Sequence, residues 1–287
     1  MRLLLTGLNA DRLEPIKLVL SAASIEHRAA LGRQGWEIWV EEVDYLRSVS
    51  AIEGFLEGEE PEEEAPPAPP QSYLKNLSGI WIALGLLAAH LAASQSADRR
   101  ALVKSFGAAA DRILDGELFR TSTALTLHGN AGHIASNMVG IALFGTAVCS
   151  ITGRGVGWLL ILAGGAAGNL VNAMFFQQDH LSIGASTAVF AAIGVLAGQQ
   201  LVTKIRLRGH RFRAWLPLGA GLALLGFLGS SQFTDLAAHL WGFICGLLFG
   251  AVYGVLVKRR PGRAAQIVSG VAAALTLGLS WLGGAAL

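Results

Sequence analysis

Residues 234–257 read TDLAAHLWGFICGLLFGAVYGVLV, an apolar stretch long enough to cross a bilayer core, which needs about 20 residues. A single imidazole, His239, interrupts it near its beginning. Gly242, Gly246 and Gly250 follow at helical spacing, and such a stripe lets a neighbouring helix approach closely. Polar side chains inside membrane helices are costly and are functional candidates. The stretch therefore predicts a tightly packed membrane helix that carries a functional histidine.

The rest of the chain repeats this apolar pattern. Hydrophobic residues make up 53% and charged residues 15%, with a mean hydropathy of +0.50, against roughly 25% charge in soluble domains. A freely soluble enzyme is excluded, and the two cysteines, both in apolar runs, do not fit a disulfide-rich secreted domain. Further spans are predicted at 77–95, 129–151, 156–176, 184–203, 213–230 and 264–286. The chain is expected to be an all-α polytopic membrane helix bundle.

A different composition precedes these spans. Residues 1–60 are balanced between apolar and charged residues, and the alternation of Trp36, Ile38 and Val40 is typical of a strand. They predict a small soluble α/β domain with the element order βαββα. Residues 61–72 are acidic and proline-rich, which is typical of an extended linker. Residues 73–287 are then the membrane domain.

The distribution of positive charge predicts the orientation. Lys and Arg are in excess on the side that holds the amino terminus, so this side is expected to be cytoplasmic and the carboxy terminus outside. The outer loop at 98–124 is longer than an ordinary connection and is expected to have structure of its own. Because no transit peptide is evident, a bacterial inner membrane is expected.

Polar side chains occur at the outer ends of three spans. His128, His133 and Asn137 belong to the second, Ser186 to the fourth and His239 to the sixth. His133 and Asn137 are four residues apart and so share a helix face. In the predicted topology all of them lie at similar depth in one leaflet. By contrast, His180 in an outer loop is expected to be solvated rather than catalytic, and Asn169 and Asn172 are expected to make packing contacts.

This set of groups suits nucleophilic catalysis. A serine hydroxyl becomes reactive when a neighbouring base such as His239 takes its proton. The resulting oxyanion needs donors, which the Ser186 N–H, His133 and the Asn137 amide supply. Asp235, one turn before His239, is expected to cap that helix rather than complete a triad. No metal and no cofactor is required, because neither an HExxH motif nor a carboxylate cluster is present in the sequence.

These residues resemble the rhomboid family of intramembrane serine proteases. The resemblance rests on His128…His133-Ile-Ala-Ser-Asn137, Gly184-Ala185-Ser186-Thr187, Ala238-His239-Leu-Trp-Gly242-Phe-Ile-Cys-Gly246 and the loop piece Gly116-Glu117-Leu118-Phe119-Arg120. It covers about residues 77–257 and implies a rhomboid-like bundle of six core helices plus a C-terminal seventh.

The resemblance also implies roles for individual residues. Ser186 is the implied nucleophile, His239 the base, and His133 and Asn137 the oxyanion hole. The implied supporting residues are His128, Gly184, Gly242 and Gly246. The chain departs from the family pattern at Thr187, where glycine is usual, and at Cys149, where glutamate is frequent. The effect of both departures on activity is left open.

The expected partners are transmembrane protein substrates and the lipid bilayer, with no nucleic acid, and an unidentified partner for the amino-terminal domain. Two rival functions stay open. The first is a non-catalytic rhomboid-like pseudoprotease that binds or escorts membrane helices, for which Thr187 leaves room. The second is a small-solute transporter, because intramembrane histidines also relay protons, although no inverted repeat is visible in the sequence.

Overall fold

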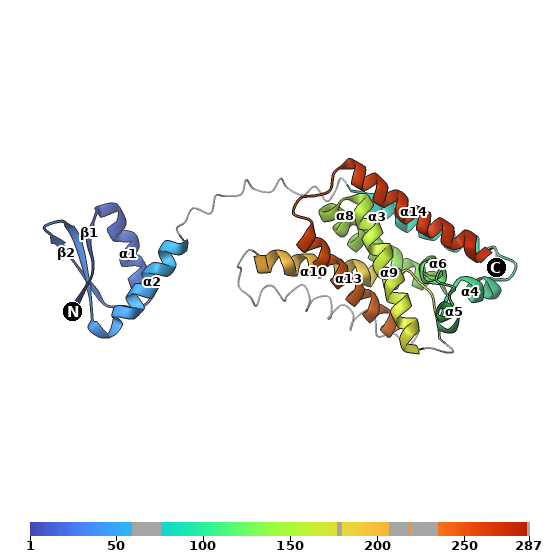
Figure 1. The fold of residues 1–287 in the computed structure, drawn as a ribbon, viewed down its shortest axis with the longest axis horizontal. Coiled ribbons are helices and arrows are strands. Elements are labelled where there is room, and N and C mark those ends of the chain that lie inside the picture. Colours follow the sequence, from blue (N-terminus) through green and yellow to red (C-terminus); the bar gives the residue numbers. More distant parts are fainter. Residues whose placement is uncertain (59–75, 177–179, 207–218, 220–234, 286–287) are drawn as a thin grey trace. The chain divides into compact units, whose positions relative to one another are not determined.

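The computed structural model describes residues 1–58, 76–176, 180–206, 219 and 235–285. The chain divides into two compact units, Met1–Pro70 and Gln71–Leu287 (Figure 1). The predicted linker at 61–72 lies entirely outside the described ranges, and the predicted span at 213–230 does so except for Gly219.

The first unit contains a three-stranded antiparallel sheet. The strands are β1 (Arg2–Leu8), β2 (His27–Gly32) and β3 (Gly35–Val40), in the order β1-β3-β2. Ile38 and Val40 are fully buried, as their alternation predicts. The helices are α1 (Ala10–Ala22), capped by the Asn9 side chain, and α2 (Tyr45–Gly58). The predicted order βαββα is confirmed, and the core of this unit contains Leu20 and Ile52 from the two helices.

The second unit is a helix bundle, which confirms the predicted fold class. Within the described residues, five helices are long and apolar enough to cross a membrane, and α3 is a shorter apolar helix. The elements of the bundle are α3 (Ser78–Ser94), α7 (Ala131–Gly140), the π-helix η4 (Ile141–Gly145), α8 (Thr146–Thr152), α9 (Arg154–Phe176), α10 (Ser186–Arg206), α13 (Leu236–Leu256) and α14 (Arg263–Ala285). The segments α7, η4 and α8 follow one another without a break and together form one span.

Helix α10 is the most buried of the described spans and packs most extensively against α13 and α9. Glycines allow the close approach. A Cβ on Gly246 would overlap the Ala191 carbonyl, and a Cβ on Gly250 would overlap the Val195 carbonyl. The glycine stripe of α13 therefore lies directly on the backbone of α10, as its spacing predicts.

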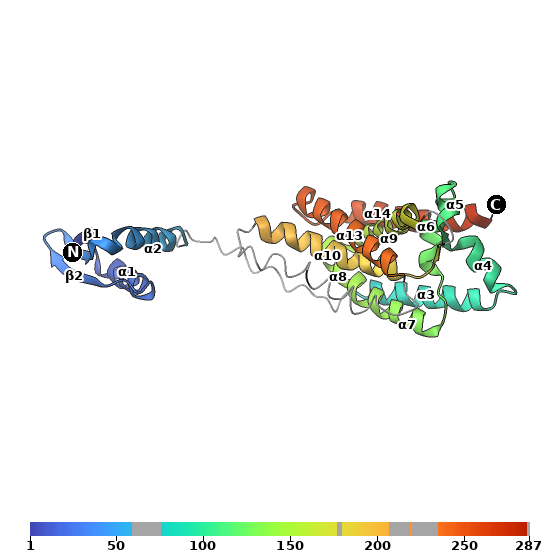
Figure 2. The same cartoon turned by 90° about the horizontal axis from the view of Figure 1, so that it is seen from below.

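Helix α14 lies at the edge of the bundle and packs against α9 (Figure 2). Only Ala273 of this helix is buried. Near its beginning, the Gln266 amide donates to the Thr152 carbonyl (2.9 Å) and accepts from the Val156 N–H (3.1 Å). Near its end, Trp281 stacks on Phe106 with a centroid distance of 4.4 Å. The seventh span is thus attached to the bundle at both ends.

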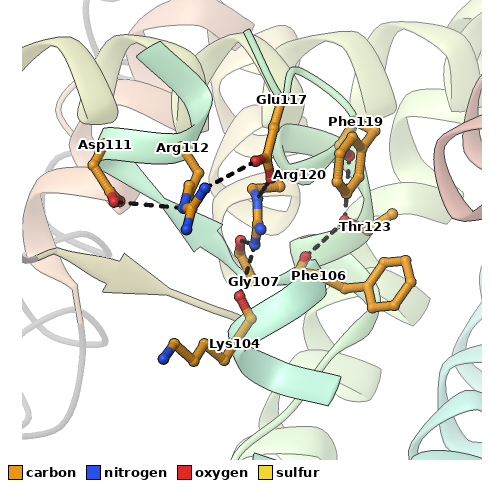
Figure 3. A network of polar contacts seen from close by, with 9 residues as sticks. All are labelled: Lys104, Phe106, Gly107, Asp111, Arg112, Glu117, Phe119, Arg120 and Thr123. Carbon is orange, nitrogen blue, oxygen red and sulfur yellow. Dashed lines mark hydrogen bonds and ion pairs between the residues drawn. The ribbon is translucent and has the colours of Figure 1, made fainter. Parts of the chain in front are cut away.

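The long outer loop is folded, as predicted. It contains α4 (Arg99–Phe106), β4 (Ala108–Ala109), α5 (Ala110–Leu114), α6 (Arg120–Thr123) and the 3-10 helix η3 (Ala124–Thr126), and β4 pairs with β5 (Leu181–Ser182). Figure 3 shows Arg120 at the centre of a network of polar contacts within this loop. Its guanidinium donates to Glu117 (2.6 Å) and to the carbonyls of Lys104 (2.8 Å) and Gly107 (3.2 Å). Because Arg120 is buried, these contacts satisfy its charge inside the loop.

Candidate active site

The first part of the candidate site is the beginning of α7. The Asn130 side chain caps this helix by accepting from the His133 N–H (2.9 Å). His133 and Asn137 follow on one face, the former half-buried and the latter buried. The Asn137 amide donates one hydrogen bond to the His133 carbonyl (3.0 Å). Because an NH₂ group has two hydrogens, a second one remains to donate to another acceptor.

The second part is the turn between β5 and α10. Gly184 has φ +127°, a conformation that suits glycine. A Cβ at this position would lie 2.5 Å from Nε2 of His133 and 3.5 Å from the Ser186 hydroxyl oxygen. The His133 ring and the Ser186 hydroxyl therefore lie beside the same glycine. As the first residue of α10, Ser186 also presents a backbone N–H that has no acceptor within its helix.

Hydrogen bonds assign the tautomers of two histidines near this turn. His133 Nδ1 accepts from the Gly129 N–H (3.4 Å), so the proton of a neutral ring is on Nε2, beside Gly184. His128 Nε2 accepts from the Ala185 N–H (3.3 Å). Because a backbone N–H donates to it, this nitrogen carries no proton. His128 therefore holds the peptide that immediately precedes Ser186.

The third part is His239 on α13. Asp235 caps this helix by accepting from the Ala238 N–H (2.9 Å), which confirms the predicted cap. The His239 ring is buried and stacks on Phe190, with centroids 4.6 Å apart and planes at 27°. Phe190 follows Ser186 by four residues and so shares its face of α10. Phe190 was not among the predicted site residues, although its spacing of four residues from Ser186 was a usable signal.

His239 also has unused hydrogen-bonding capacity. Its Nδ1 is buried and has no partner among the described residues. In the described part of the chain no hydrogen bond joins the Ser186 hydroxyl to this ring. Catalytic hydrogen bonds are often long before a substrate binds, so this arrangement is compatible with a serine and its base.

The two departures from the family pattern are accommodated by glycines. Thr187 is buried, and its Cγ2 lies 2.9 Å from where a Cβ on Gly168 or on Gly242 would stand. Its methyl group therefore fills space that these glycines leave open between α9 and α13. The Cys149 thiol is buried against Gly157 and donates to the Arg154 carbonyl (3.7 Å).

A polar cluster joins three elements near His239. His180 Nε2 and Asn172 Nδ2 both donate to one carboxylate oxygen of Asp235, at 2.6 and 2.9 Å. His180 also stacks on Phe176 at 4.1 Å. His180 was expected to be solvated rather than catalytic; its side chain is 24% exposed, and its ring contacts both Phe176 and Asp235. Asn172 therefore makes a hydrogen bond between α9 and the beginning of α13, and not only a packing contact.

Three histidine rings lie in a row near the turn between β5 and α10. The ring centroids of His90 in α3 and His128 are 6.3 Å apart, and those of His128 and His133 are 5.2 Å apart. Both pairs meet edge-on. In the residues that the structure describes, no group of three His, Cys, Asp or Glu side chains has the arrangement of a metal site.

Comparisons with known proteins found a matching family profile and several similar proteins. The family profile described as the Rhomboid domain matches residues 115–256. Relatives include RHOMBOID-like protein 1 of Arabidopsis thaliana, 30% identical over 48% of this chain and 35% of that protein. The Putative rhomboid protease YdcA of Bacillus subtilis is 29% identical over 47% of this chain and 67% of its own length. The Rhomboid protease GluP of the same bacterium is 30% identical over 53% of this chain and 29% of that protein.

Proposed function

Because the chain belongs to the rhomboid family, we propose that it is a serine endopeptidase that hydrolyses peptide bonds in or next to transmembrane segments of other proteins. The observation that supports the proposal is the set of contacts made by three groups. His133 and Ser186 lie beside Gly184, and Phe190, one turn after Ser186, stacks on His239. The proposed nucleophile, base and oxyanion donor thus come from three separate spans.

The proposed reaction begins with attack of the Ser186 hydroxyl on the substrate carbonyl, while His239 takes the hydroxyl proton. The tetrahedral oxyanion receives hydrogen bonds from the Ser186 N–H, from His133 Nε2–H and from the free hydrogen of the Asn137 amide. Protonated His239 then gives its proton to the leaving amine. A water molecule, activated by the same ring, hydrolyses the acyl-enzyme and restores Ser186.

The substrate class follows from the position of the site inside a membrane bundle. A spanning helix has all its backbone groups bonded internally, so it must unwind before a carbonyl reaches Ser186. Substrates are therefore expected to carry glycine, proline or other helix-weakening residues near the cleaved bond. If a segment built only of leucine were cleaved as fast as its glycine-containing counterpart, this part of the proposal would be wrong.

The decisive experiment compares three variants of the full chain in detergent or liposomes: Ser186→Ala, His239→Ala and the control Ser280→Ala. Ser280 is on α14 and donates to the Thr276 carbonyl of the same helix. Cleavage of a model transmembrane substrate and labelling by a fluorophosphonate probe are measured. Both should disappear in Ser186→Ala, with a loss of about 10³-fold or more in cleavage, and should be unchanged in the control.

The same experiment separates the rival functions. Substrate capture that persists in Ser186→Ala, with no cleavage by the unsubstituted chain, would favour a pseudoprotease. Solute uptake that survives Ser186→Ala would favour a transporter. Either result would overturn the proposed hydrolysis.

We further propose that the first unit lies in the cytoplasm and that the chain ends on the opposite side, in a bacterial plasma membrane. Support comes from the basic residues near the inner ends of the spans, including Arg154 and Lys258 to Arg260. Single cysteines introduced at Glu53 and at Asp98 test it. A membrane-impermeant thiol reagent added outside cells should label only the cysteine at position 98.

A further inference from the structure

A cavity of about 340 Å³ lies between α3 and α14. Its walls come from α3, η3, η4, α9, α10 and α14, and they include Leu86, Trp158 and Ala274. Of the described residues that line it, Thr126 is the one with a hydroxyl group, and none is charged. A cavity without polar partners does not retain water, so its natural filling is apolar.

The cavity opens sideways toward the region that lipid occupies. Ile82 of α3, at its rim, is 41% exposed, and Ala274 of α14 is also exposed. Helix α3 packs on α7 and η4, whereas α14 packs on α9, so the two helices flank the opening rather than close it. Both α14 and α9 are membrane-spanning helices, and the filling available at this depth is hydrocarbon.

A second hollow continues from the cavity toward the end of the bundle where α3 and α9 begin. Ile82 and Trp158 line both spaces, and Ser78 and Arg154 add polar groups to the second one. Arg154 is exposed, and its guanidinium has no ion-pair partner among the described residues. The two hollows therefore form one groove with an apolar part inside the bilayer and a cationic part at its surface.

We propose that this groove binds a glycerophospholipid with an anionic headgroup. One acyl chain fills the cavity between α3 and α14, and the headgroup phosphate lies on Arg154. A guanidinium binds phosphate through two parallel hydrogen bonds, and the trend from apolar to cationic along the groove matches the two ends of such a lipid.

The bound chain reaches the backbone of the candidate site. Ala185 and Ala188 line the cavity, and they lie on either side of Ser186 and Thr187 in sequence. The proposal requires only that the bundle is in a membrane, so it stands or falls independently of the proposed proteolysis.

The test uses the full chain in phosphatidylcholine nanodiscs, with phosphatidylglycerol whose acyl chain carries a diazirine. After illumination, labelled peptides are mapped by mass spectrometry. Label is expected on cavity-lining residues of α3 and α14. Ala274→Trp, which fills the cavity, should lower this labelling at least about 5-fold, the equivalent of 1 kcal/mol in affinity. The matched control Leu275→Trp, on the adjacent exposed position outside the lining, should leave it unchanged.

The headgroup is tested with Arg154→Gln. This change should weaken phosphatidylglycerol binding about 5- to 10-fold through loss of a charge-assisted bond, and leave labelling by a neutral diazirine diacylglycerol unaltered. Inorganic phosphate at millimolar concentration should not compete, because it lacks the acyl chain. If phosphate did compete, Arg154 would belong to a site for free anions, and the assignment of the groove to a lipid would be overturned.

Two other results would also overturn the proposal. One is equal labelling of Ala274→Trp and Leu275→Trp, and the other is label spread evenly over all lipid-facing helices. Displacement of the lipid by a transmembrane peptide would assign the groove to a protein helix instead. If Ala274→Trp lowers the thermal unfolding midpoint, Ile82→Trp blocks the same opening from α3 and is expected to give the same loss of labelling.

Discussion

Gly184 meets two requirements at one residue. Its φ of +127° is strained for any side chain, and a Cβ would overlap the His133 ring. Side-chain volume and backbone conformation thus both select glycine beside Ser186. The role of this residue is to let two groups from different spans share one small space.

Gly184→Ala is expected to lower substrate cleavage by about 100-fold or more, since a displacement of about 1 Å at a reacting group has this effect. The strained backbone should also cost about 1–3 kcal/mol in the free energy of unfolding. Cleavage rates and thermal unfolding in detergent measure both. Gly85→Ala is the control, because a Cβ there meets open space. Full activity of Gly184→Ala would contradict the proposed contact.

Asp235 is the second residue whose environment has a measurable consequence. Burial opposes its charge, but the Ala238 N–H and His180 outweigh burial and hold the pKa of this carboxyl below its usual value of 3.8. A carboxyl with a lowered pKa in the folded state stabilises the protein above its unfolded pKa. That contribution is lost as the pH falls through the lower, folded value.

The unsubstituted chain is therefore expected to lose stability below about pH 4 more steeply than Asp235→Asn, in which the capping oxygen remains but no carboxyl titrates. The thermal midpoint between pH 6 and pH 3 measures this. Asp111→Asn removes an exposed carboxyl and should keep the steep profile. If the thermal midpoint of all three proteins fell equally with pH, the proposed contribution of the Asp235 carboxyl to stability would be wrong.

At the scale of elements, the contact between α10 and α13 fixes the position of His239 along the helix axis relative to Ser186. Gly242 lies on the Thr187 carbonyl, and Gly246 on the Ala191 carbonyl. Because backbone meets backbone at these points, neither helix can move to admit a side chain without a shift of the whole interface.

Gly246→Ala is accordingly expected to destabilise the bundle by about 1–3 kcal/mol, as overpacking does in a close-packed interior. Substrate cleavage should fall as well, because His239 moves with α13. Gly278→Ala places the same methyl group on α14, where a Cβ meets no atom within 4 Å, and should be neutral. Thermal unfolding of the two variants distinguishes these outcomes.

Helix α14 supports the outer loop as well as the proposed lipid groove. Trp281 stacks on Phe106, and Phe106 packs edge-on against Phe119, with a centroid distance of 6.2 Å. The seventh span is thus connected through aromatic rings to the segment that carries Arg120.

Trp281→Ala is expected to loosen α4 to α6, because an aromatic pair contributes about 0.5–1.5 kcal/mol beyond the area it buries. Amide hydrogen exchange in residues 99–123 should become faster. Leu282→Ala alters an exposed neighbour on the same helix and should leave the exchange unchanged. Equal exchange in the two variants would show that α14 does not support the loop.

At the scale of the whole molecule, the chain consists of two units with separate interiors. The apolar core of the first unit is built from Leu13, Leu20, Ile38, Val40 and residues near them, all within residues 1–58. The core of the second unit contains Phe190 and Phe243 and includes none of these residues. Each unit therefore has an apolar core of its own.

Residues 1–58, expressed alone, are expected to fold and to unfold in one cooperative transition followed by circular dichroism. Ile38→Ala, a change at a fully buried position, should lower the free energy of unfolding by about 2–5 kcal/mol and abolish folding of so small a domain. Leu46→Ala, at a position that is 80% exposed, should have little effect. Absence of a transition in the unsubstituted fragment would show that it depends on the rest of the chain.

The amino-acid sequence by itself determined the elements. Apolar length defined the spans, alternation defined the strand with Ile38 and Val40, and a side chain before an apolar run defined the cap at Asp235. The glycine spacing of α13 also predicted a close helix neighbour. These features depend on neighbours within a few residues, whose relative positions are fixed by the helix or strand period.

Tertiary structure alone decided which distant groups meet. Spacing along the chain could not show that Gly184 separates His133 from Ser186, that His128 holds the Ala185 N–H, or that Phe190 stacks on His239. Nor could it show that His180 contacts Asp235, which lies 55 residues further along the chain. Such pairs are determined by the packing of whole helices, because a contact between separate spans depends on their depth and rotation and not on their order in the sequence.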